Sequence, residues 1–196
     1  MKITKGKALI ILGVVLLVID QVIKVLVKTN MSIGESIHVF NWFQIFFIEN
    51  EGMAYGMKFG GAVGKFCLSL FRVVLSGVLI WWISKLLKRS DVPTGALVGL
   101  TLITAGAMGN IIDCLFYGMI WDYAPFMFGR VVDMFYFPLI ETVWPTWMPF
   151  VGGEKYIFFA PVFNFADSCV TCGAIYLLLF QWKFFSAEED RIIEKR

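Results

Sequence analysis

The chain has 196 residues, of which 59% are hydrophobic and only 16% are charged. A soluble domain normally carries about 25% charged residues, so the excess apolar surface has to face a medium other than water, and lipid is the obvious candidate. The net charge of +2 is too small to indicate nucleic-acid binding. No internal repeat or low-complexity tract divides the sequence, so we expect residues 1–196 to form a single integral membrane domain.

Four apolar runs have about the length of a membrane-spanning helix, which needs roughly 20 residues. They cover residues 8–27, 66–87, 95–117 and 163–185. The lysines before the first run are also typical of a secretory signal peptide, but no small-x-small cleavage site follows. The sequence therefore predicts an all-α membrane protein with four transmembrane helices.

Four spans place both termini on one side of the membrane, and basic residues indicate which side. Ten lysines and arginines flank the spans on the side of the termini, against five on the opposite side. Cytoplasmic segments carry the excess of basic residues, so we expect cytoplasmic termini. The segments at about 29–64 and 118–162 then face outward, and the second, which is rich in Trp, Tyr and Phe, is expected at the membrane interface.

In the first outward segment, the residues from Ile37 to Asn50 follow an alternating pattern, and many of them are β-branched or aromatic. This pattern predicts strand structure. The block NEGMAYGM at residues 50–57 follows and contains Gly52 and Gly56. Glycines at this spacing indicate tight turns or close approach of the backbone to a ligand, and a plain hairpin explains them equally well.

Four aspartates lie within or beside the apolar runs: Asp20, Asp113, Asp133 and Asp167. Asp113 ends the third run, Asp167 begins the fourth, and Asp133 lies in the connection between them. The topology places all four toward the outer end of the helices, as a site would require. Lys24 follows Asp20 by four residues, so the two share a helix face and can form an ion pair that is structural or supports a site.

Asp133 and Asp167 lie in strongly apolar surroundings, where an ionised side chain is costly unless it is compensated. Two close carboxyls in a low-dielectric site tend to share one proton, which makes one acid and one base around a single water molecule. The helix dipole favours an anion at Asp167, so we expect Asp167 to be the more readily ionised member. A structural interpretation also fits, because Asn164 followed by Asp167 resembles a capping box.

Five blocks along the chain resemble the motifs of the lipoprotein signal peptidases (signal peptidase II), aspartic peptidases of the bacterial inner membrane. The blocks are DQVIK at 20–24, NEGMAYGM at 50–57, GNIID at 109–113, RVVDMF at 130–135 and FNFAD at 163–167. Each block alone is weak, but five in this order on a four-span frame are specific. The long insert at 138–160 is similar to the form found in Bacteroidota members.

The resemblance implies cleavage of a prolipoprotein signal peptide just before a cysteine that carries a diacylglyceryl group. It implies that Asp133 and Asp167 are the catalytic pair: one activates water, and the other polarises the scissile carbonyl and later protonates the leaving amine. No metal or other cofactor is expected. The residues expected to bind substrate or support the site are Asn50, Gly52, Asn110, Asp113, Arg130, Asn164, Asp20 and Lys24.

The resemblance also implies partners and a cellular location for the protein. The expected partners are diacylglyceryl-modified prolipoproteins and membrane lipid, without nucleic acid, and the protein is expected to be a monomer. It would be a multi-pass protein of the bacterial cytoplasmic (inner) membrane, with its active site toward the outer face. The segment at about 29–64 would correspond to an extracytoplasmic β-cradle.

The sequence departs from the family pattern at Cys114, where the family has an arginine after GNxxD. Arg130 and Arg72 are candidates to supply the contact that this arginine would make.

Two other classes of protein fit parts of the sequence. A proton-coupled transporter or channel subunit would explain intramembrane acids and Arg72, but it requires polar groups through the membrane depth. A non-enzymatic assembly factor would explain only the aromatic surface.

Overall fold

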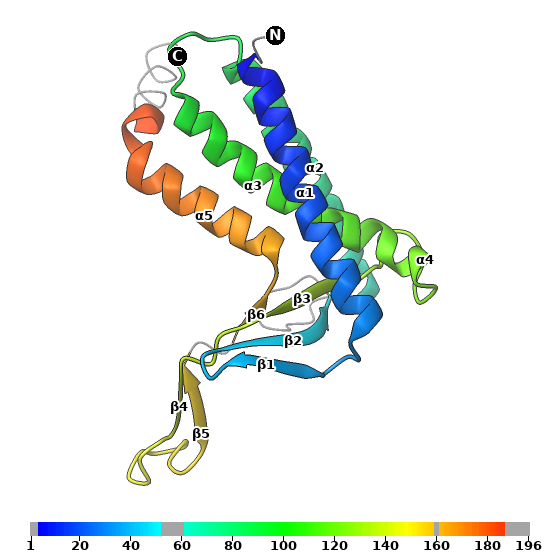
Figure 1. Cartoon of the computed structure of the whole chain (residues 1–196), viewed down its shortest axis with the longest axis vertical. Helices are drawn as coiled ribbons and strands as arrows, with labels where there is room; N and C mark the ends of the chain where they lie inside the picture. Colours follow the sequence, from blue (N-terminus) through cyan, green and yellow to red (C-terminus); the bar gives the residue numbers. More distant parts are fainter. Residues whose placement is uncertain (1–3, 52–60, 159–160, 187–196) are drawn as a thin grey trace.

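The computed structural model of the chain describes residues 4–51, 61–158 and 161–186. Helices form the upper part of the molecule in Figure 1, and their bounds are α1 (Lys5–Asn30), α2 (Gly61–Leu86), α3 (Thr94–Ile112) and α5 (Phe165–Phe180). A small sheet lies beneath their lower ends, while the link between α2 and α3 lies at the opposite end (Figure 1).

Within the described residues, three helical stretches are long and apolar enough to cross a membrane: Lys5–Asn30, Gly61–Leu86 and Thr94–Ile120. The outer faces of α1 and α2 carry exposed apolar side chains, such as Ile10, which is 68% exposed, and Phe71, which is 62% exposed. Bare apolar surface on this scale is stable in lipid rather than in water. The apolar helices expected from the sequence are thus present, and they are those of a membrane protein.

The fourth apolar helix is shorter than the others. α5 has 16 residues and ends at Phe180, where the backbone N–H of Gln181 donates to the carbonyl of Leu177. A separate helical stretch follows at 182–186. The apolar run expected to continue as one helix to residue 185 is therefore interrupted at Gln181.

Small residues allow α3 and α5 to pack closely. A Cβ atom on Gly99 would lie 2.4 Å from Cδ2 of Leu177, and one on Gly106 would lie 2.3 Å from the carbonyl oxygen of Ala166. Glycine at these positions therefore lets the backbones approach, as small residues do in membrane helix pairs. The first turn of α5 is held against α3 in this way.

The sheet has four antiparallel strands in the order β1-β2-β3-β6. Their bounds are β1 (Ser36–Phe40), β2 (Phe43–Asn50), β3 (Val131–Tyr136) and β6 (Val162–Phe163). The strand structure expected between residues 37 and 50 is confirmed. The description all-α is not confirmed, because this sheet joins both outward segments into one layer.

One face of the sheet packs on the helices. Val27 at the end of α1, Phe47 on β2 and Val132 and Met134 on β3 form a buried apolar cluster with Tyr117. Tyr117 belongs to a single π-helical stretch (η2, Asp113–Tyr117) that extends α3 and leads into α4 (Gly118–Ile120). Alternate residues of a strand point to opposite faces, so this packing fixes which residues of β3 face the other way.

The long insert forms a hairpin of its own. Strands β4 (Ile140–Val143) and β5 (Lys155–Phe158) pair with each other and project from the sheet away from the helices (Figure 1). Trp144 packs on Tyr156 with ring centroids 4.5 Å apart. The hairpin is therefore a two-stranded sheet separate from the four-stranded one.

Candidate active site

Asp133 lies in the middle of β3, opposite Ile48 of β2. Its side chain is buried, with the residue only 2% exposed. Its Oδ1 accepts a hydrogen bond from Nδ2 of Asn164 at 2.7 Å, and its Oδ2 accepts one from Nδ2 of Asn50 at 3.1 Å. Side-chain amides from the end of β2 and from the residue before α5 thus orient this carboxyl.

Asp167 lies in the first turn of α5, where the capping box predicted from the sequence is present. Asn164 is the N-cap residue: its side-chain oxygen accepts from the backbone N–H of Asp167 at 3.0 Å, and its backbone N–H donates to Oδ2 of Asp167 at 3.2 Å. The other oxygen of Asp167 accepts from Nδ2 of Asn110 at 2.8 Å. Asp167 therefore serves as a capping residue and also takes part in a wider polar network.

Asn164 connects the two carboxyls. It is fully buried. Its Nδ2 donates to Asp133 and also to Oδ1 of Asn110 at 3.1 Å, so both of its side-chain protons are used. Because its backbone contacts Asp167, Asp133 and Asp167 lie around one asparagine.

The electrostatic environment of Asp133 favours its protonated form. Burial, together with the nearby charge of Asp167, raises the pKa of Asp133 to about 7. The hydrogen bonds from Asn50 and Asn164 and the charge of Lys24 act in the opposite direction but are weaker. Near neutral pH the Asp133 carboxyl is therefore able to donate or accept a proton, as acid–base catalysis requires.

A buried ionic cluster supports the pair from the helices. Nζ of Lys24 lies 2.9 Å from Oδ2 of Asp20, 2.8 Å from Oδ2 of Asp113 and 2.9 Å from Oδ1 of Asn110. The ion pair between Asp20 and Lys24 predicted from their spacing is confirmed. Since the ammonium group has three protons, all of them find acceptors, as a fully buried lysine requires.

The two acids of this cluster each hold the backbone next to one member of the pair. Oδ1 of Asp20 accepts from the N–H of Ala166 at 3.0 Å, and Oδ2 of Asp113 accepts from the N–H of Val132 at 3.3 Å. Ala166 precedes Asp167 in the chain, and Val132 precedes Asp133. The cluster therefore positions each carboxyl through the backbone of the residue before it.

Gln21 and Tyr117 also belong to this cluster, and the sequence did not single them out. Nε2 of Gln21 lies 3.1 Å from Oδ2 of Asp20 and 3.0 Å from Oδ1 of Asp113, and its Oε1 accepts from the Tyr117 hydroxyl at 3.1 Å. The only sequence signal for Gln21 is its place between Asp20 and Lys24 in the block DQVIK. Nothing in the local sequence marks Tyr117.

Some of the expected site residues lie elsewhere. The Arg130 side chain contacts Glu49 and not the aspartate pair, with Nη1 3.3 Å from Oε2. Nη1 of Arg72 donates to Sγ of Cys114 at 3.2 Å, so Arg72 is the arginine that contacts Cys114. Gly52 and the rest of 52–60 fall outside the described residues. Among the residues described, no group of His, Cys, Asp and Glu could hold a metal ion.

The two carboxyls around Asn164, at one end of an apolar helical bundle, suit a membrane-bound enzyme that uses acid–base chemistry. Comparison with known proteins agrees with this class. The sequence profile of a family described as Signal peptidase (SPase) II matches residues 12–183. The chain therefore belongs to the signal peptidase II family and is an aspartic-type peptidase.

Relatives and solved structures match over most of the chain. A lipoprotein signal peptidase of Porphyromonas gingivalis (strain ATCC 33277) is 49% identical over 193 residues, which cover 91% of this chain and 84% of that protein. One from Amoebophilus asiaticus is 37% identical and covers 85% of this chain and 75% of its own. A bacterial membrane enzyme solved by the in meso method aligns with a TM-score of 0.63 at 25% identity, covering 92% of this chain and 90% of that one. These likenesses favour a peptidase over the transporter and assembly-factor alternatives.

Proposed function

We propose that this peptidase removes the signal peptide from prolipoproteins by hydrolysing the bond before a cysteine that carries a diacylglyceryl group. Asp133 and Asp167 are its catalytic pair. The observation that carries this assignment is the position of both carboxyls around Asn164, which donates its side-chain N–H to Asp133 and its backbone N–H to Asp167. The names of the relatives, lipoprotein signal peptidases, support the class of substrate.

In the proposed mechanism Asp167 is the base and Asp133 is the acid. Asp167, in the first turn of α5, accepts a proton from water as the water oxygen attacks the scissile carbonyl carbon. Asp133, whose pKa is raised to about 7, donates its proton to the carbonyl oxygen. When the tetrahedral intermediate collapses, the C–N bond breaks and Asp167 gives its proton to the leaving amine. Asp133 takes back the proton on the former carbonyl oxygen as the new carboxyl group forms.

The remaining polar residues act on the pair and not on the substrate bond. Asn50 and Asn164 orient the Asp133 carboxyl, and Asn110 orients Asp167. Asp20 and Asp113, both paired with Lys24, hold the backbone beside each carboxyl. Gly52 remains a candidate for substrate contact on the strength of its motif alone.

The proposed setting is the bacterial inner membrane, spanned four times by α1, α2, α3 and α5. The basic residues gathered near the chain termini and in the link between α2 and α3 favour a cytoplasmic position for that end. The sheet and the pair would then face outward, where a substrate held by its acyl chains can enter laterally from the bilayer. We propose that the protein works as a monomer, in contact with lipid and with its prolipoprotein substrate.

The test is cleavage of a diacylglyceryl-modified prolipoprotein by the purified protein in lipid nanodiscs. Asp133→Asn and Asp167→Asn keep the side-chain size but remove the proton-transfer group, so each should lower kcat by about a thousandfold or more. Asp122→Asn is the matched control and should keep full activity, because Asp122 is exposed and its left-handed backbone (φ 54°) is tolerated by asparagine. Robust cleavage by either pair variant would rule out the two-aspartate mechanism.

A further inference from the structure

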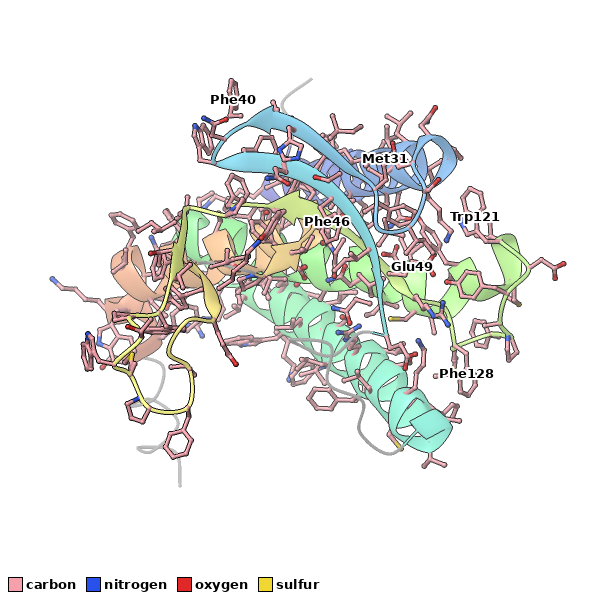
Figure 2. All side chains as sticks on the ribbon, turned by 90° about the horizontal axis from the view of Figure 1, so that it is seen from below. Met31, Phe40, Phe46, Glu49, Trp121 and Phe128 are labelled. Atoms are coloured by element: carbon pink, nitrogen blue, oxygen red, sulfur yellow. The ribbon has the colours of Figure 1, made fainter. Side chains whose placement is uncertain are left out.

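Glu49, near the end of β2, is a buried acid that the proposed mechanism does not use. Its side chain is only 6% exposed. Figure 2 shows the sheet from below, with Glu49 labelled beside the last residues of β2. Its carboxylate forms an ion pair with Lys28 in the last turn of α1, and its Oε2 lies 3.3 Å from Nη1 of Arg130, the residue just before β3. One side chain thus ties three segments together.

Aromatic rings fix the two cations that hold Glu49. Nζ of Lys28 lies 5.0 Å from the ring centroid of Tyr123 and 5.3 Å from that of Trp121. Cζ of Arg130 lies 5.5 Å from the same Tyr123 ring, and its backbone N–H donates to the Tyr123 hydroxyl at 2.7 Å. Cation–π contacts of this kind hold the charged groups in place, so the ion pairs have a defined geometry.

The end of β2 needs such a tie because its ladder with β3 is interrupted. The register shifts between Ile45 and Ile48. Beyond this irregularity, only residues 48–50 of β2 still pair with β3. A bulge disrupts the ladder locally and leaves the residues beyond it with fewer neighbouring hydrogen bonds. Glu49 lies within this short terminal ladder, opposite Val132.

This terminal ladder carries one of the two groups that orient Asp133. Asn50 follows Glu49 directly, and its Nδ2 donates to Oδ2 of Asp133 at 3.1 Å. Val132, opposite Glu49, directly precedes Asp133. A shift of this end of β2 would therefore change the distance between the Asn50 amide and the Asp133 carboxyl.

We propose that Glu49 is a positioning residue for the reaction: through Lys28 and Arg130 it fixes the end of β2, so that the Asn50 amide holds the Asp133 carboxyl in place. This inference rests on the proposed role of Asp133. Glu49 does not contact the pair, and it acts through Asn50.

The experiment is a double-mutant cycle between Glu49→Gln and Asn50→Ala, with kcat and KM measured on a diacylglyceryl-modified prolipoprotein. Because Asp133 acts only in the chemical step, a displaced Asn50 should lower kcat by roughly tenfold to a hundredfold in Glu49→Gln and change KM by less than about twofold. The double variant should lose no more than Asn50→Ala alone, because both changes remove the same hydrogen bond. Glu154→Gln, the same change on the exposed turn before β5, is the control and should match the unaltered protein.

Two further variants keep the test decisive. Arg130→Gln removes the more exposed partner of Glu49 and serves if Glu49→Gln does not fold; it should lower kcat in the same way but less. An unchanged kcat in either variant, or losses that multiply in the double variant, would overturn the role of Glu49. Asp133→Asn in the same assay separates the two claims: if it stays active the proposed mechanism fails, and if only Glu49→Gln stays active this inference alone fails.

Discussion

Asn164 shows how much of the site depends on single side chains. Both of its amide protons and its side-chain oxygen are hydrogen-bonded, to Asp133, Asn110 and the backbone of Asp167. Replacing it with a residue of another shape would leave buried acceptors without donors, which costs about 1–3 kcal/mol for each group. The geometry of the two carboxyls and the stability of the first turn of α5 therefore depend on the same residue.

The shifted pKa of Asp133 predicts a pH dependence of catalysis. The proposed mechanism requires Asp133 to be protonated, and burial with the charge of Asp167 raises its pKa to about 7. The value of kcat/KM should therefore fall as the pH rises through about 7, where the free enzyme loses this proton. The measurement is a pH–rate profile of the purified protein on a lipid-modified substrate.

A variant of Asn50 checks that this titration belongs to Asp133. The Asn50 amide donates to the carboxyl and so stabilises its charged form, which lowers its pKa. Asn50→Ala removes that hydrogen bond, while Asp167 and Lys24 remain, so the fall in kcat/KM should move to higher pH. A profile that stays in place or moves to lower pH would mean that another group controls the alkaline limb.

At the scale of elements, the glycines of α3 decide where α5 begins. A Cβ atom on Gly106 would meet backbone atoms of α5: the Ala166 carbonyl oxygen, in the first turn, at 2.3 Å and the Val170 nitrogen at 3.1 Å. Backbone cannot rotate away as a side chain can, so α5 would have to shift. Asp167 is in that turn, and the contact therefore couples helix packing to the position of the Asp167 carboxyl, the proposed base.

Gly106→Ala should consequently damage both stability and activity. Overpacking of a close contact costs about 1–3 kcal/mol, and the displaced turn should also lower kcat. Gly77→Ala on α2 is the matched control, because a Cβ there meets nothing within 4 Å, and it should leave both quantities unchanged or raise the melting temperature slightly. Thermal unfolding in detergent and the cleavage assay give the two readouts, and equal behaviour of the two variants would contradict this account.

The elements also show what local sequence can and cannot predict. The apolar runs predict the helices to within a few residues, except that Gln181 ends α5 early. The ion pair of Asp20 with Lys24 and the capping box at Asn164 follow from spacings of four and three residues. The pairing of β2 with β3 does not follow, because Asn50 and Asp133 are 83 residues apart and no local pattern encodes that register.

For the whole molecule, Lys24 is the point at which the helices and the sheet are joined. It contacts Asp20 on α1, Asn110 on α3 and Asp113 at the start of η2. Through Asp113 and Asp20 the cluster reaches the backbone of β3 and of α5. A single buried cation thus balances two acids that are far apart in the sequence, Asp20 and Asp113, and the relative position of four elements depends on it.

Lys24→Met should therefore destabilise the entire bundle and not only one contact. Methionine fills a similar volume, but it leaves Asp20 and Asp113 buried without their cation, a change that costs about 3–5 kcal/mol. The free energy of unfolding of the protein in detergent should fall by that amount. Cleavage should fall with it because Asp20 and Asp113, which hold the backbone beside each carboxyl of the pair, lose the cation that holds them. Lys88→Met, in the exposed turn just after α2, removes the same charge without a buried partner and should have little effect. If Lys24→Met unfolds like the Lys88→Met control, the cluster does not hold the bundle and sheet together, and the two carboxyls must be positioned without it, by Asn50, Asn110 and Asn164.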